Sequence, residues 1–113
     1  ISVAKDGSQA AGWSRFPAIS RAGDTIVFTS ASDGLVPEDA NGIVDVFAFD
    51  VYGESLQLLS ADRKGIPGNG TSFSGAGSLS IDGSWCVFTS DATNLVHRHS
   101  KGGIRNVFLV RLK

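Results

Sequence analysis

A short polar loop offers the clearest candidate for chemistry in this sequence. Residues 39–45 read DANGIVD, so Asp39, Asn41 and Asp45 place oxygen-bearing side chains around a glycine. Carboxylate and amide oxygens are the ligands that a hard cation such as Ca²⁺ prefers, and the glycine permits a tight turn. Asp and Asn also stabilise turns through hydrogen bonds to their own backbone. The loop is therefore interpreted either as a structural turn or as a Ca²⁺ site, and Ca²⁺ is the one cofactor that the sequence suggests.

The two histidines form a second, weaker candidate. His97 and His99 are two residues apart and could share a metal on an extended segment. Their charged neighbours Arg98 and Lys101 repel cations, so a solvated loop is the preferred interpretation. The patterns G-x-S-x-G, H-E-x-x-H and the P-loop are absent from the sequence. We therefore expect no catalytic residues and a protein that is not an enzyme.

The single cysteine, Cys86, stands between two apolar residues in the segment WCVF. One cysteine cannot form an internal disulfide. A reactive thiol needs a base and an accessible, electropositive setting, which the interior of an apolar strand does not offer. The sequence predicts that Cys86 is a small buried hydrophobe.

The elements that must position these residues are repeated. Three stretches of the first half recur about 60 positions later in the same order, and self-similarity at a fixed period indicates a repeat architecture. They are residues 20–30 with 80–90, 35–36 with 95–96 and, after a slip of one residue, 42–47 with 103–108. The chain therefore consists of nearly two copies of one unit.

Each copy has the pattern of short strands separated by turn residues. Residues 25–30 are almost continuously apolar, which is typical of a strand covered on both faces. Residues 44–50 alternate, so Val46 and Ala48 are expected on one face and Phe47 and Phe49 on the other. In the first copy we expect strands at residues 17–20, 25–30, 44–50 and 55–60, with a long loop at 31–43. The second copy is expected to repeat them without its last strand, because the sequence ends at Lys113.

Four short antiparallel strands per repeat are typical of a β-propeller blade. The pattern S-x-x-P-x-I-S-x-x-G-x-x-[IV]-V-F-x-S, followed by LV and by D-x-N-G-x-x-D-V-F-x-x-D, resembles the WD40-like PD40 repeats of TolB-like β-propellers. The acidic part is intact at residues 39–47 but is replaced by HSKGGIRN at residues 99–106. The expected fold is all-β: two consecutive four-stranded antiparallel blades, the second lacking its last strand, as a partial β-propeller.

The repeat also predicts how the chain is divided. Trp13 and Phe73 occupy equivalent positions before the first strand of each blade. They are expected either to pack between neighbouring blades or to form a binding platform, for example for a carbohydrate. The predicted parts are residues 1–12 (the end of a preceding strand and a connecting loop), 13–60 (blade 1), 61–72 (a Gly-rich inter-blade loop) and 73–113 (blade 2).

Charge and length restrict the partners. The net charge of the 113 residues is −1, which provides no general footprint for nucleic acid, and no apolar run approaches the roughly 20 residues that span a bilayer. Two blades cannot close a ring, since propellers have four to eight, so further blades or further copies of the chain are expected. Residues 13–60 contain seven acidic and two basic residues, whereas residues 72–113 contain two acidic and five basic ones. Opposite charges on neighbouring blades favour head-to-tail contact.

The resemblance implies a non-catalytic scaffold that mediates protein–protein interaction or assembly within a larger extracytoplasmic complex, either periplasmic or extracellular. Two alternatives remain open, because propellers host many functions. The first is an accessory propeller domain of a larger enzyme, such as a peptidase of the prolyl-oligopeptidase type. The second is a carbohydrate-binding propeller.

Overall fold

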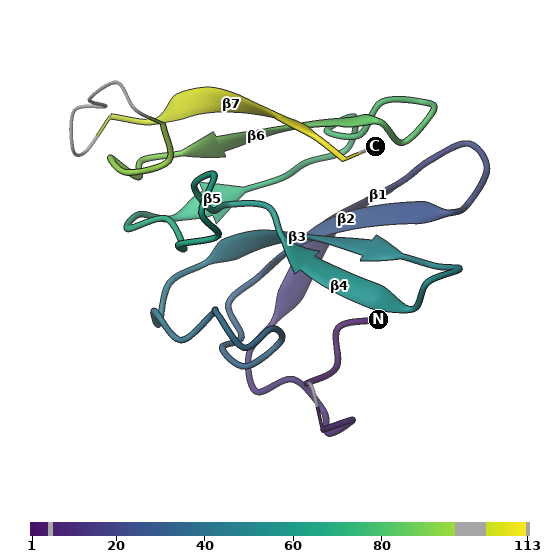
Figure 1. Cartoon of the computed structure of the whole chain (residues 1–113), viewed down its shortest axis with the longest axis horizontal. Helices are drawn as coiled ribbons and strands as arrows, with labels where there is room; N and C mark the ends of the chain where they lie inside the picture. The colour runs from purple at the N-terminus through teal and green to yellow at the C-terminus, as the bar shows by residue number, and fades with distance from the viewer. Residues whose placement is uncertain (5, 97–103, 113) are drawn as a thin grey trace.

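The computed structural model describes residues 1–4, 6–96 and 104–112 as an all-β molecule. Seven strands form two antiparallel sheets, one of four strands and one of three, and no helix occurs among the described residues. The two sheets lie one above the other (Figure 1). Within the same described ranges, no helix is long and apolar enough to cross a membrane. The prediction of an all-β chain with antiparallel strands is confirmed.

The first sheet is a simple meander in which each strand pairs with the next one along the chain. Thr25–Ser30 has the predicted limits, and all but one of its six residues are buried. Phe28 pairs with Phe47 in the register between the two central strands, and their rings stack with centroids 5.7 Å apart. The strands are β1 (Ser14–Ile19), β2 (Thr25–Ser30), β3 (Asp45–Asp50) and β4 (Ser55–Leu58).

The second sheet repeats the central strand pair of the first. Phe88 pairs with Phe108 as Phe28 pairs with Phe47, and the two rings again stack, with centroids 5.6 Å apart. The repeat seen in the sequence is therefore a repeat of strand register. The strands are β5 (Ser72–Phe73), β6 (Trp85–Ser90) and β7 (Asn106–Arg111), and no counterpart of β4 occurs among the described residues.

The first strand differs between the two copies, and here the prediction of identical strands was wrong. In the first copy β1 runs six residues and has an irregularity at Phe16, whose φ is 55°. In the second copy β5 has only two residues, and Leu79 makes an isolated bridge to Cys86. The cause is the segment GAG at residues 75–77, because Gly77 adopts a φ of 96° and the backbone turns there.

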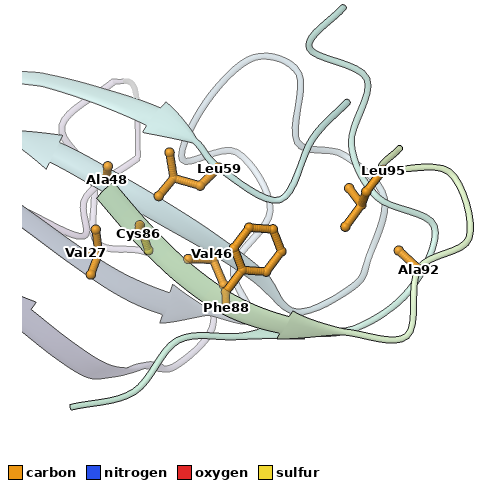
Figure 2. Close-up of a cluster of buried hydrophobic side chains, with 8 residues drawn as sticks. All are labelled: Val27, Val46, Ala48, Leu59, Cys86, Phe88, Ala92 and Leu95. Atoms are coloured by element: carbon orange, nitrogen blue, oxygen red, sulfur yellow. The ribbon is translucent and has the colours of Figure 1, made fainter. Parts of the chain in front are cut away.

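The main hydrophobic core lies between the two sheets. Figure 2 shows Cys86 and Phe88 of β6 beside Val27 of β2 and Val46 of β3. Burying a valine or phenylalanine side chain completely stabilises a fold by roughly 1.5–3 kcal/mol, so this contact holds the sheets together. Cys86 is fully buried, and burial raises the pKa of its thiol to about 11, which confirms it as a core residue. The remaining members are Ala48, Leu59, Ala92 and Leu95.

A second cluster covers the opposite face of the first sheet. Phe28 and Phe47 pack there against Leu35 and Val36, which come from the loop between β2 and β3. The predicted alternation of β3 is thereby confirmed, because Val46 and Phe47 enter different clusters. Leu35 and Val36 therefore hold the loop between β2 and β3 against the sheet, and this packing positions the polar side chains that follow in the sequence.

A polar junction also joins the sheets. Ser74, just after β5, donates its backbone N–H to the Thr29 hydroxyl of β2 (2.8 Å). The Ser74 hydroxyl lies 2.8 Å from that same hydroxyl and donates to the carbonyl of Phe16 (3.1 Å). The second sheet is therefore held in a defined position against β1 and β2.

Candidate functional site

The loop between β2 and β3 places a carboxylate in the interior of the protein. Asp39 is 1 % exposed, and neither of its carboxylate oxygens has a hydrogen-bond partner among the described residues. Its backbone is well held, because its N–H donates to the carbonyl of Val36 (3.2 Å) and its carbonyl accepts from Gly34 (3.1 Å). Buried polar groups are nearly always paired, so this carboxylate needs an explanation.

Asp45, the first residue of β3, is buried close to Asp39 and is well paired. Its Oδ1 accepts a hydrogen bond from the Ser60 hydroxyl (2.6 Å), and its Oδ2 accepts one from Nδ2 of Asn41 (2.9 Å). The Ser60 hydroxyl in turn accepts the backbone N–H of Val46 (3.0 Å). These bonds fix the Asp45 side chain at the point where the loop enters β3.

Asn41 lies between the two aspartates in the sequence and acts as a bridge. Its Oδ1 accepts the N–H of Ile43 (2.9 Å), which forms the local turn expected of an Asn in such a loop. Its Nδ2 donates to Asp45 and also to the carbonyl of Gly68 (3.3 Å). Asn41 thus ties the loop to the segment that leads into the second sheet.

The electrostatics of this pair follow from burial. Burial, followed by the negative charges of Asp45 and Asp33, raises the pKa of Asp39 to about 7. Burial also raises the pKa of Asp45, while the hydrogen bonds from Ser60 and Asn41 oppose the shift. No lysine or arginine of the described residues contributes to either shift. Among the described residues, Asp39 and Asp45 are therefore two neighbouring carboxyl groups whose pKa values no cationic side chain shifts.

The structure brings Asp39, Asn41 and Asp45 together. This set contains two carboxylates. In the part of the chain that the structure describes, no group of three or more His, Cys, Asp or Glu is arranged to hold a metal. Asp33 stands at the exposed side of the loop, where its Oδ1 accepts the N–H of Gly42 (3.1 Å). The other metal candidates, His97 and His99, lie outside the described residues.

Trp13 and Phe73 occupy different surroundings, and the prediction that they are equivalent was wrong. Ser14 pairs with Ser30 as Ser72 pairs with Ser90, so Trp13 corresponds to Thr71. Trp13 is exposed at the surface, with the guanidinium of Arg15 4.8 Å from its ring centroid. Phe73 meets Phe16 of the first sheet edge to face, with centroids 6.2 Å apart, and Arg105 lies 5.2 Å from its ring. Phe73 thus packs between the sheets, and the binding platform that includes it stays a prediction.

A further feature, which the sequence analysis did not name by residue, is an apolar surface on the second sheet. We call it the open face. Val107 is 74 % exposed and Leu109 is 62 % exposed, and both lie on β7, the edge strand of the second sheet. Repeat alignment combined with strand alternation was the signal that could have found them, since their counterparts Val46 and Ala48 were assigned to one face. The open face consists of Trp85, Val87, Val107 and Leu109.

No family model, curated protein or solved structure matches this chain. The chemistry available must therefore be judged from the two features just described. The buried pair of Asp39 and Asp45 can hold a proton or a hard cation. The open face can bury apolar area against another surface.

Proposed function

We propose that this chain is a non-catalytic scaffold, made of two consecutive β-propeller blades, that assembles with further sheets of its own kind through the open face. The main support for the proposal is that equivalent faces of the two sheets differ in solvent exposure. Val46 and Val107 are repeat counterparts on the third strand of each unit, yet Val46 is fully buried and Val107 is 74 % exposed. In the first sheet, the cover is provided by the second sheet.

The open face has the composition of a buried contact. Val87 of β6 and Leu109 of β7 are direct partners in the register, so their side chains form one continuous apolar surface. Arg111 borders this surface, with its guanidinium 5.7 Å from the ring centroid of Trp85. Each Å² of apolar area removed from water stabilises by roughly 25 cal/mol, which favours association through such a face.

The occupant that fits is the first sheet of another copy of this chain. Within one molecule, β6 and β7 turn a face with Phe88 and Phe108 toward the first sheet. The first sheet carries the equivalent pair, Phe28 and Phe47, on the side that faces away from the second sheet, where Leu35 and Val36 pack against it. A neighbouring copy that presented this side to the open face would repeat the internal contact. It would also bring the acidic half of one copy beside the basic half of the next.

Contacts of this head-to-tail kind generate rings when the rotation closes, and a ring of four to eight blades is the usual form of a propeller. The resemblance to TolB-like propellers supports an extracytoplasmic setting, periplasmic or extracellular, and a place within a larger complex. In this proposal the chain binds protein and carries no catalytic residue.

Light scattering after size exclusion, over a concentration series of the chain, tests the proposal. The informative variant is Val107→Lys, and Ile81→Lys is its matched control because both side chains are 74 % exposed. We expect the wild type and Ile81→Lys to associate as concentration rises, and Val107→Lys to stay monomeric with an unchanged melting temperature. A wild type that is monomeric throughout, or equal association of the two variants, would overturn the proposal.

A further inference from the structure

We propose that Asp39 and Asp45 bind a divalent cation, Ca²⁺, in the interior of the loop between β2 and β3. Two observations support the assignment. The first is the pairing of two buried carboxyl groups at the start of β3. The second is the Asp39 carboxylate itself, which is 1 % exposed and has no hydrogen-bond partner on either oxygen among residues 1–4, 6–96 and 104–112.

Charge balance favours a divalent ion over the alternatives. A buried ionised carboxylate without a partner is costly, and the neighbouring Asp45 increases the cost. A proton on Asp39 neutralises only one of the two groups and leaves a buried negative charge. A divalent cation neutralises both. Among the described residues, no lysine or arginine contributes to the pKa shift of either group, so a divalent ion would supply the missing positive charge.

The donor atoms select the class of metal. Asp39 offers two carboxylate oxygens, and Asp45 offers Oδ2, which now accepts from Asn41. The Asn41 amide is held by the N–H of Ile43 on its Oδ1 (2.9 Å), so Asn41 positions Asp45 through its Nδ2. An all-oxygen set suits a hard cation, and the irregular loop suits the adaptable geometry of Ca²⁺ better than the strict octahedron of Mg²⁺.

The two repeats differ at this site, because only the first repeat has the two carboxylates. With the one-residue slip of the repeat, Asp39 corresponds to Ser100, Asn41 to Gly102 and Asp45 to Asn106. The second copy therefore has neither carboxylate. One ion per chain is expected, and because only two carboxylates contribute, its dissociation constant should be in the weak range of about 10⁻⁴–10⁻³ M.

Calorimetric titration of the chelator-treated chain with CaCl₂ at pH 8 tests this inference, with MgCl₂ in a parallel arm. We expect one Ca²⁺ per chain, weaker binding of Mg²⁺, and a melting temperature that rises by about 5 °C or more when Ca²⁺ is in 100-fold excess over its dissociation constant. At pH 5 the binding should weaken at least tenfold, because protons compete for the carboxylates. No heat and no change in melting temperature at pH 8 would overturn the inference.

Two variants locate the site. Asp39→Asn keeps the shape of the side chain and removes its charge, and it should abolish both the Ca²⁺ heat and the melting response. Glu38→Gln is the matched control, since it removes a negative charge from the exposed neighbour and should bind as the wild type does. Ca²⁺ binding that survives in Asp39→Asn, or that is lost equally in Glu38→Gln, would contradict the site. None of these outcomes depends on association through the open face.

Discussion

The central strand pair of the first sheet, β2 and β3, is repeated as β6 and β7 in the second sheet, but its surroundings differ. In both, a stacked pair of phenylalanines lies on one face and a pair of valines on the other, in the same register. In the first sheet both faces are covered, whereas in the second the valine face is exposed. The strand pattern therefore encodes a unit that stacks, and the environment of each copy depends on its neighbours.

The largest effect should come from placing one charge at the two equivalent valines. Val46→Lys buries an ammonium group in the core between the sheets, and we expect it to destabilise the fold by about 4 kcal/mol or more. Val107→Lys should change the stability of the monomer by no more than about 0.5 kcal/mol, because the site is exposed. Urea unfolding of the two variants measures the difference. Similar losses of stability in the two variants would contradict the conclusion that Val46 and Val107 differ in exposure.

The acidic loop of the first repeat should give the metal-free chain an unusual pH dependence. The pKa of Asp39 is raised from 3.8 to about 7 in the folded state, so the folded chain binds more protons than the unfolded chain between these values. The contribution of Asp39 to stability should be greatest below about pH 4 and should fall as the pH rises toward 7, by up to roughly 4 kcal/mol.

Urea midpoints measured with a chelator from pH 4 to pH 8 check this dependence. Asp39→Asn removes the titrating group, so its midpoint should vary less with pH and should exceed that of the wild type at pH 8. A wild-type midpoint that climbs over the same range would mean that Asp39 is stabilised as a carboxylate in the folded chain.

A smaller effect is expected at two serines near the first strand of each sheet, one at the junction between the sheets and one within a sheet. Ser74 joins the sheets through Thr29 and the carbonyl of Phe16, so Ser74→Ala should cost about 1–2 kcal/mol. Ser14 donates only to Ser30 within its own sheet (3.0 Å), and Ser14→Ala should cost about 0.5–1 kcal/mol. Thermal melting of the pair tests the order, and the reverse order would show that the junction contributes little to holding the sheets together.

Much of the strand arrangement could be predicted from the sequence, because it follows from local pattern. The apolar run of β2, the alternation of Val46 with Phe47 and the burial of Cys86 all reflect how a strand presents its side chains. The short β5 was missed because the repeat suggested a strand where the glycines at 75 and 77 form a turn. Matching positions in a repeat do not ensure matching backbone geometry.

The candidate site was predictable in composition but not in environment. The spacing of Asp39, Asn41 and Asp45 pointed to oxygen ligands, and the structure places them together. The burial of Asp39 could not be read from its neighbours in sequence, because it results from Leu35 and Val36 packing on the face of the first sheet. The orientation of the Asn41 amide likewise depends on Gly68, which is distant along the chain.

The most direct test of the central claim is the environment of Trp85 on the open face. The chain has two tryptophans, so the variant Trp13→Phe leaves Trp85 as the only one. We predict that its fluorescence emission shifts to shorter wavelength as the concentration of this variant rises, because a second copy covers the open face, and that Val107→Lys in the same background abolishes the shift. An emission maximum that stays constant while light scattering reports association would show that the copies meet elsewhere, and it would contradict the account.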